Sequence, residues 1–160
     1  MKILILGHGR HGKDTFAEFL QKHCGLSFIS SSRACAEVLK PTLDLINGEK
    51  SSEEHFAERH NNRELWKRLI SLYNAADPSA LARLILTISD VYVGMRSARE
   101  YEASKHLFDR IYWVTAAERV PYTDSTMEIG FDNTRMLLVD NSGTLEELEG
   151  KVKTLSWVLR

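Results

Sequence analysis

The chain has 160 residues, which suits one domain that buries roughly two thirds of the surface of its unfolded chain. Lysine and arginine total 21 and aspartate and glutamate total 22, so the net charge of -1 excludes an overall positive field for nucleic acid or membrane. No apolar run has the length of a signal peptide or a membrane span, so we expect a soluble cytoplasmic protein. Cys24 and Cys35 fit neither a disulfide framework nor a zinc pattern and are expected to be buried free thiols.

The first predicted element is a strand at residues 3–6, which leads directly into a glycine-rich loop and then into a helix. The loop reads Gly7-His8-Gly9-Arg10-His11-Gly12-Lys13-Asp14-Thr15. When a G-x-x-x-x-G-K loop joins a strand to a helix, the unpaired backbone N–H groups at the start of the helix can bind phosphate oxygens. The positive end of the helix dipole stabilises the same negative charge. Lys13 adds a cation for the outer phosphates. We therefore expect this loop to bind ATP and Lys13 to act in catalysis.

A second pattern fits the same loop, because Gly7, Gly9 and Gly12 spell the dinucleotide fingerprint G-x-G-x-x-G. A site for NAD needs an acidic residue about 20 positions further on, where this chain has three serines and Arg33. Arg33 suits the 2′-phosphate of NADP, so an NADP-binding oxidoreductase stays open. The phosphate-loop interpretation is favoured, because only it explains the lysine that follows the last glycine.

Asp14 stands where phosphate loops usually have serine or threonine, and a hydroxyl comes one position later at Thr15. Both residues are candidate Mg²⁺ ligands. The sequence Gly-Lys-Asp-Thr resembles the loop of phage deoxynucleoside monophosphate kinases and is similar in form to the Gly-Lys-Gly-Thr of adenylate kinases. This resemblance implies a P-loop NTPase-like α/β fold in a single domain over residues 1–160. Its three-layer sandwich would hold a five-stranded parallel sheet, with a helical insertion between strands 2 and 3.

The first helix is predicted to end at Cys24, with Gly25 as its cap, and residues 26–29 predict the second strand. The end of this strand meets the phosphate loop at one edge of the sheet, which makes Ser31 and Arg33 candidates for binding the acceptor. For the serines a plainer interpretation is preferred, in which Ser31 or Ser32 caps the next helix.

Residues 51–89 are predicted to form helices, the first headed by Ser51 or Ser52, where the resembling kinases keep their acceptor-binding region. An apolar face is expected at Leu65, Trp66, Leu69, Ile70 and Tyr73, and basic and amide side chains line the polar side between residues 59 and 68. Arg63 and Trp66, about one turn apart, are candidates to grip a nucleic-acid backbone and stack a base. A solvated helix face explains the same pattern and is favoured.

The third strand is predicted at residues 91–94, and Arg96 follows it at a strand end that faces the phosphate loop. Phage deoxynucleotide kinases have a similar strand and arginine, usually with an aspartate just before the arginine. Gly94 stands roughly at that position here, and Asp14 is the nearest replacement for the carboxylate. The resemblance thus implies catalytic roles for Asp14 and Arg96, with Arg96 also contacting the acceptor.

After a fourth strand at residues 111–115, the resemblance implies a segment that covers the phosphates. Arg119 is the expected covering arginine, with a catalytic role. Asp124 and Glu128 suit either this site, where Asp124 would bind the acceptor, or a plain surface loop.

A fifth strand at residues 136–139 precedes Asn141, and Thr144 with Glu147 predicts a capping box for the last helix. This segment is similar to the closing segment of nucleotide kinases and dephospho-coenzyme A kinases. The resemblance implies that the backbone of Asn141 lies near the adenine of ATP.

These parts predict an ATP- and Mg²⁺-dependent phosphotransferase, because moving a γ-phosphoryl group needs mainly positioning and charge neutralisation. The loop, together with the run Tyr-Val-Gly-Met-Arg at residues 92–96, looks most like the phage P-loop kinases that phosphorylate 5-hydroxymethyluracil within DNA. That resemblance implies thymidine hypermodification in a host cytoplasm. A kinase of free deoxynucleoside monophosphates is the alternative. A nucleotide-binding module without catalysis also stays open, because Gly94 replaces the usual carboxylate.

Overall fold

Five parallel strands form the central sheet, in the order β2-β3-β1-β4-β5. The computed structural model describes residues 1–122 and 126–157 of the chain. The strands are β1 (Ile3–Leu6), β2 (Phe28–Ser30), β3 (Val91–Val93), β4 (Arg110–Thr115) and β5 (Leu137–Asp140). β1 lies at the centre, where Ile5 is level with Val93 of β3 and Tyr112 of β4. The prediction of a five-stranded parallel sheet is confirmed, with strand ends displaced by at most two residues.

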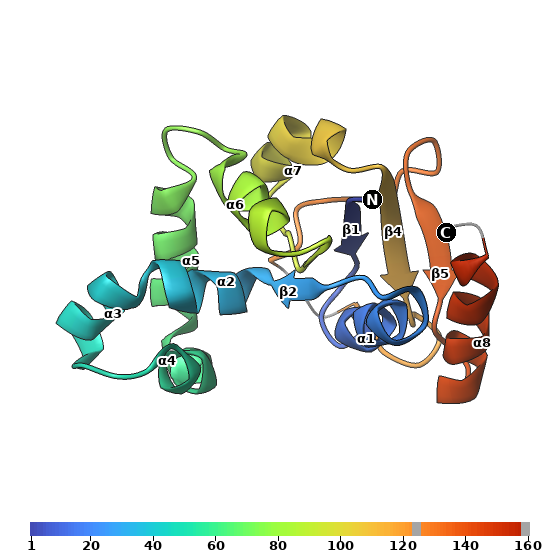
Figure 1. Cartoon of the computed structure of the whole chain (residues 1–160), viewed down its shortest axis with the longest axis horizontal. Coiled ribbons are helices and arrows are strands. Elements are labelled where there is room, and N and C mark those ends of the chain that lie inside the picture. The colour runs from blue at the N-terminus through green and yellow to red at the C-terminus, as the bar shows by residue number, and fades with distance from the viewer. Residues whose placement is uncertain (123–125, 158–160) are drawn as a thin grey trace.

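Helices cover both faces of the sheet and give three layers (Figure 1). On one face, α1 (Lys13–Cys24) and α8 (Leu145–Ser156) pack in the same apolar cluster as the first and third residues of β1. On the other face lie α6 (Ala80–Ile88), α7 (Ala98–Ser104) and the 3-10 turn η2 (Lys105–Leu107). Because the side chains of β1 alternate between two helix layers, all four are fully buried, which is why this strand is apolar throughout.

Between β2 and β3 the chain forms the predicted helical insertion, which extends on the β2 side of the sheet (Figure 1). Before α6 it contains α2 (Ser31–Val38), α3 (Lys40–Asn47), α4 (Ser52–Glu58), the 3-10 turn η1 (Arg59–Asn62) and α5 (Arg63–Tyr73). α4 begins as predicted, because Ser51 and Glu54 form a reciprocal capping box.

Three helix ends test the sequence predictions. Gly25 ends α1 with φ +70° and donates its N–H to Gln21 O, as expected, and Thr144 and Glu147 form the predicted capping box of α8. The cap of α2 was placed wrongly. Its N-cap is Ser30, whose Oγ accepts from the N–H of Arg33 at 3.3 Å. β2 runs one residue further than expected and passes into α2 without a loop, so the hydroxyl of Ser31 is not used as a cap.

Within residues 1–122 and 126–157, no helix has the length and apolar character needed to cross a membrane. Both cysteines are free thiols, as expected. Cys35 is buried on α2 as predicted, whereas Cys24 at the end of α1 is only partly buried.

Candidate functional site: the phosphate loop and its surroundings

The loop after β1 has a backbone conformation that depends on its glycines. Gly7 and Gly12 have φ of +141° and +89°, a region that L side chains seldom adopt. Space is also limiting, because a Cβ on Gly12 would lie 2.2 Å from Nδ2 of Asn141. Arg10, at φ +67°, is the one non-glycine residue with positive φ in the described chain. The loop therefore turns sharply through three left-handed positions before α1 begins.

The N-terminus of α1 opens directly onto this loop. Gly12 is its N-cap, and no side chain of the described residues caps the helix. Its first backbone N–H groups are therefore placed to receive an anion. Nζ of Lys13 donates to the carbonyl oxygen of His8 at 2.7 Å, which folds the lysine back across the loop. Lys13 and the first backbone N–H groups of α1 therefore lie close together at the start of the helix.

The side chain of His11 joins the loop to the end of β4. Its side chain is fully buried, and Nδ1 accepts a hydrogen bond from the backbone N–H of Ala116 at 2.9 Å. Burial lowers the pKa of His11, and the nearby His8 lowers it further, while the backbone carbonyl of Val120 acts in the opposite direction. The neutral form is thus favoured, with Nδ1 as acceptor. His11 is therefore a structural support of the loop, held by the end of β4.

Asn141 and Arg119 lie next to each other, beside the loop. Nδ2 of Asn141 donates to the backbone carbonyl of His11 at 3.0 Å, and its own N–H bonds to Thr115 O at 2.6 Å. Nη2 of Arg119 donates to the backbone carbonyl of Asn141 at 3.1 Å. The turn after β5 is therefore joined to both the phosphate loop and the end of β4.

An aromatic group lies against the loop histidines. The ring of Tyr122 lies 4.6 Å from the ring of His8 and 5.5 Å from that of His11, measured between centroids, and stacks with His11 at 30°. His8 also meets Trp113 of β4 edge-on at 5.7 Å. Tyr122 is exposed on its other side, so the loop has an aromatic cover that the sequence analysis did not foresee.

The two candidate Mg²⁺ ligands lie in the first turn of α1, with Asp14 exposed and Thr15 half-buried. One oxygen from each suits Mg²⁺, which takes one or two protein oxygens and completes its shell with phosphate and water. In the part of the chain that the structure describes, no three His, Cys, Asp or Glu side chains gather as a metal site. A Mg²⁺ ion at Asp14 and Thr15 therefore depends on bound phosphate for its other ligands.

Arg96 follows β3 and contacts the segment predicted to cover the phosphates. Its Nη1 donates to Oγ1 of Thr126 at 2.6 Å, and its carbonyl accepts from the N–H of Glu128 at 3.0 Å. The carboxylate of Glu128 in turn accepts from the N–H of Ala98. Asp124, the other predicted residue of this segment, lies outside the described residues.

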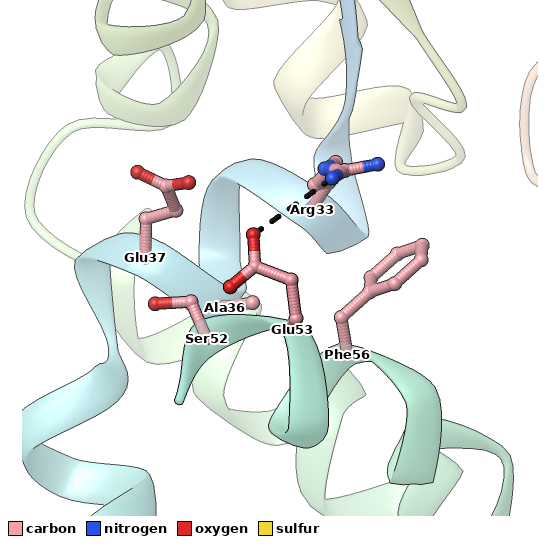
Figure 2. Close-up of a pocket in the computed structure, with 6 residues that line it drawn as sticks. All are labelled: Arg33, Ala36, Glu37, Ser52, Glu53 and Phe56. Atoms are coloured by element: carbon pink, nitrogen blue, oxygen red, sulfur yellow. Dashed lines mark ion pairs between the residues drawn. The ribbon is translucent and has the colours of Figure 1, made fainter. Parts of the chain in front are cut away.

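Arg33 is exposed and turns toward the insertion rather than the phosphate loop. Its Nη2 lies 3.9 Å from Oε1 of Glu53, and its guanidinium carbon 5.6 Å from the ring centroid of Phe56. Figure 2 shows these side chains around a small notch between α2 and α4. Arg59 lies over the same ring at 3.8 Å, so two arginines share one aromatic side chain.

Trp66 does not serve as a stacking platform. Only 5% of it is exposed, and it packs in the core beside Leu69. The base-stacking interpretation of the pair with Arg63 is therefore wrong on this point, because the tryptophan belongs to the apolar side of α5. The side chain of Arg63 lies outside what the structure describes. On the polar side, Arg68 pairs with Glu64, as a solvated helix face would.

A buried polar network beneath the end of β3 was missed by the sequence analysis. The hydroxyl of Tyr92 donates to Oε1 of Glu100 at 2.7 Å, and the two residues are 0% and 5% exposed. Burial raises the pKa of Glu100 to about 7, against the hydrogen bonds from Tyr92 and Asn74. Burial, together with the Glu100 charge, also raises the pKa of Tyr92, while a hydrogen bond with the Ser31 side chain lowers it.

The signal for this network was present in the sequence. Tyr92 stands between Val91 and Val93 in a strand that is buried on both faces, and a buried tyrosine hydroxyl needs a partner. The first acidic residue to follow on a helix is Glu100. Its partner role becomes visible only once α7 is known to cover the Tyr92 face.

Comparisons with known proteins extend the description of the fold only slightly. No protein-family model matches the chain, and no curated protein matches it. Among solved structures, an unliganded sugar kinase from Janibacter sp. HTCC2649 is similar, with a TM-score of 0.48 and 13% sequence identity. That alignment covers 98% of this chain and 93% of the sugar kinase chain.

Proposed function

We propose that this protein is an ATP-dependent phosphotransferase that moves a γ-phosphoryl group to a deoxynucleotide-type acceptor. The observation that carries the proposal is the N-terminus of α1, which no side chain of residues 1–122 and 126–157 caps. It follows a left-handed glycine loop at the end of the central strand, with Lys13 folded across it. Backbone N–H groups and one lysine at this place are the means by which phosphate loops hold a nucleotide triphosphate.

Six of the predicted site residues have the following parts in this proposal. Lys13 neutralises charge on the outer phosphates, and Arg96 and Arg119 supply further positive charge from the ends of β3 and β4. Asn141 holds the loop from the side on which the adenine would lie. Asp14 and Thr15 would bind Mg²⁺ with the phosphates. When bound, the ion neutralises charge that develops between the β- and γ-phosphates.

For the acceptor, we propose the hydroxymethyl group of 5-hydroxymethyluracil within DNA. The support is the sequence resemblance of the phosphate loop and of residues 92–96 to the phage kinases that act on this base. Arg33 and Arg59 on the insertion give local positive charge for a DNA strand in a chain whose net charge is -1. A free deoxynucleoside monophosphate remains the second acceptor, with Ser31, Arg33 and Arg96 as its ligands.

The order of the strands argues against the NADP interpretation. In the dinucleotide-binding order 3-2-1-4-5-6, the second strand lies beside the first, so its last residue reaches the ribose. Here β3 separates β2 from β1, and Arg33 turns toward α4. The binding-only interpretation rests on the missing carboxylate at Gly94, and it predicts ATP binding without transfer.

The deciding experiment measures transfer from γ-labelled ATP with Mg²⁺. The acceptors are DNA containing 5-hydroxymethyluracil, unmodified DNA and the free deoxynucleoside monophosphates. We expect label in the hydroxymethyluracil DNA alone, and loss of transfer in Lys13→Ala. Lys153→Ala, an exposed lysine on α8, is the control and should keep the wild-type rate. Full activity of Lys13→Ala would overturn the phosphate-loop assignment, and label in a monophosphate would identify a nucleotide-pool kinase.

A further inference from the structure

Ser31 has a hydroxyl that its own helix does not use. Ser30 caps α2, and Ser31 is the first helical residue. Its side chain lies beside Gly94, at the carboxyl edge of the sheet, where a Cβ on Gly94 would stand 3.3 Å from Ser31 Oγ. Because Gly94 has no side chain, nothing at that position covers the hydroxyl, and Ser31 is half-buried rather than enclosed. The hydroxyl therefore lies between the carboxyl edge of the sheet, where the acceptor is expected to bind, and the protein interior.

From Ser31 inward, the polar side chains are ordered in one direction. Tyr92 gives its only proton to Oε1 of Glu100 at 2.7 Å, so toward the Ser31 side chain, which lowers the pKa of Tyr92, its oxygen can act only as an acceptor. Ser31 is then the donor to Tyr92, and its own oxygen retains a lone pair for a further donor. The chain of donors thus points from the edge of the sheet to a buried carboxylate.

The surroundings of Glu100 suit a group that takes up a proton. The groups that face its carboxyl are Tyr92 from β3, the Cys35 thiol from α2 and the amide of Asn74 after α5. No lysine or arginine of the described chain pairs with this carboxyl. Asn74 is fixed in turn, because its Oδ1 accepts from the N–H of Leu81 at 3.0 Å. With its pKa raised to about 7 by burial, Glu100 exchanges a proton close to neutral pH.

We propose that Ser31, Tyr92 and Glu100 form a proton relay that deprotonates an alcohol acceptor, in place of the carboxylate missing at Gly94. The acceptor oxygen forms a bond to the γ-phosphorus of ATP as the bond from that phosphorus to the ADP oxygen breaks. The acceptor proton passes to Ser31 Oγ, the Ser31 proton to the Tyr92 oxygen, and the Tyr92 proton to the Glu100 carboxylate. The neutral carboxyl later returns the proton to water by the reverse path.

The relay rests on the proposed function and specifies its acceptor. An alcohol carries a proton that must leave as the phosphoryl group arrives. The attacking oxygen of a monophosphate is largely ionised at neutral pH, because its second pKa is about 6. A relay of this kind is therefore of use only for a hydroxyl acceptor, such as a hydroxymethyl group on a base.

The test uses the full chain, ATP with Mg²⁺, and DNA containing 5-hydroxymethyluracil. We expect kcat to fall about 100-fold in Glu100→Gln, Tyr92→Phe and Ser31→Ala, which is the low end of the effect of a general base. The KM for the DNA should stay within about twofold. The double variant of Ser31 and Glu100 should be no slower than either single variant. The acid limb of the wild-type kcat profile, near pH 7, should be absent in Glu100→Gln.

Two matched controls separate the relay from a structural role. Tyr101→Phe removes a buried hydroxyl without a hydrogen-bond partner among the described residues, and Glu102→Gln neutralises an exposed carboxylate on the same helix. Both should keep the wild-type kcat. Tyr92→Phe leaves Glu100 without its hydrogen-bond donor and can unfold the protein, so circular dichroism is recorded for every variant. If Tyr92→Phe is unfolded, Ser31→Ala provides the test.

The outcomes distinguish the relay from the proposed function. If Glu100→Gln and Ser31→Ala are folded and as fast as the wild type, while Lys13→Ala is inactive, the relay is overturned and the kinase stands. Transfer to monophosphates but not to the hydroxymethyl group overturns the relay and the proposed acceptor, and the phosphotransferase itself stands. If the wild-type protein transfers no phosphate to any acceptor, both proposals fail.

Discussion

Nδ2 of Asn141 donates a hydrogen bond to the backbone carbonyl of His11 at 3.0 Å, although the two residues lie 130 positions apart in the sequence. The same amide occupies the place that a side chain on Gly12 would need. Ala116 adds a second link, through its N–H to Nδ1 of His11. The phosphate loop is therefore held in shape by the ends of β4 and β5 as well as by its own glycines.

Gly12→Ala should remove nucleotide binding because it disturbs this arrangement twice. A left-handed backbone costs an alanine about 1 to 2 kcal/mol, and the new Cβ also displaces Asn141. We expect ATP binding, measured by calorimetry, to fall below detection. Gly25→Ala is the matched control, since Gly25 has φ +70° but nothing within 4 Å of its Cβ position. It should lose about 1 kcal/mol of stability and keep its ATP affinity, and equal loss of binding in both variants would contradict the role of Asn141.

His11 should make the stability of the folded protein fall at mildly acidic pH. Burial, and next the His8 charge, lower its pKa from 6.5, so the unfolded chain takes up a proton on this residue before the folded protein does. The free energy of unfolding should therefore decrease as the pH falls below 6.5. The decrease ends below the lowered pKa of the folded state.

The measurement compares urea unfolding of the wild type with that of His11→Asn between pH 8 and pH 5. Asparagine places an amide oxygen near the position of Nδ1 but does not titrate. The wild type should lose more stability than the variant over this range. His106→Asn, at an exposed histidine, is the control and should parallel the wild type. Identical pH dependence in the wild type and His11→Asn would contradict the neutral, buried role of His11.

The strands, the capped helices and the glycine loop were predictable because each depends on neighbours in the sequence. The burial of Trp66 agrees with the helical spacing of the apolar residues from Leu65 to Tyr73, and the stacking role conflicted with that same pattern. The cap of α2 was misplaced by one or two residues, since pairing of β2 with β3 extends the strand to Ser30. The link between Asn141 and His11, and that between Tyr92 and Glu100, join separate elements and leave no local pattern.

Asp44 should make the insertion sensitive to acid. Its carboxylate accepts from Nζ of Lys40 at 2.5 Å and lies 2.7 Å from Nε2 of the buried His55, which joins α3 to α4. The hydrogen bonds from Lys40 and His55 lower the pKa of Asp44 from its ordinary value of 3.8. The stabilisation is therefore complete above pH 3.8 and is lost as the pH falls below that value.

To test this, the free energy of unfolding of Asp44→Asn is subtracted from that of the wild type at pH 5 and at pH 3. The difference should be positive at pH 5 and smaller at pH 3. Glu64→Gln breaks the exposed pair with Arg68 and should change stability by less than about 0.5 kcal/mol at either pH. A difference for Asp44→Asn that does not change with pH would show that the contacts of Asp44 do not stabilise the insertion.

Ionised Glu100 should destabilise the folded protein at neutral and alkaline pH, whereas ionised Asp44 stabilises it. Its pKa rises from 4.5 in the unfolded chain to about 7 in the folded protein, chiefly by burial, so the folded state binds the proton more tightly. The contribution of Glu100 to stability is therefore most favourable below pH 4.5, declines between pH 4.5 and pH 7, and is level above. One unit of pKa is worth about 1.4 kcal/mol, so the total loss is about 3 kcal/mol.

Glu100→Gln keeps an oxygen for the Tyr92 hydroxyl but carries no charge. It should match the wild type within about 1 kcal/mol at pH 4.5 and exceed it by up to about 3 kcal/mol at pH 8, measured by urea unfolding. Glu102→Gln, exposed on the same helix, should show no such divergence. If the difference between Glu100→Gln and the wild type is the same at both pH values, the buried carboxyl keeps one protonation state throughout this range and has no proton to exchange near neutral pH.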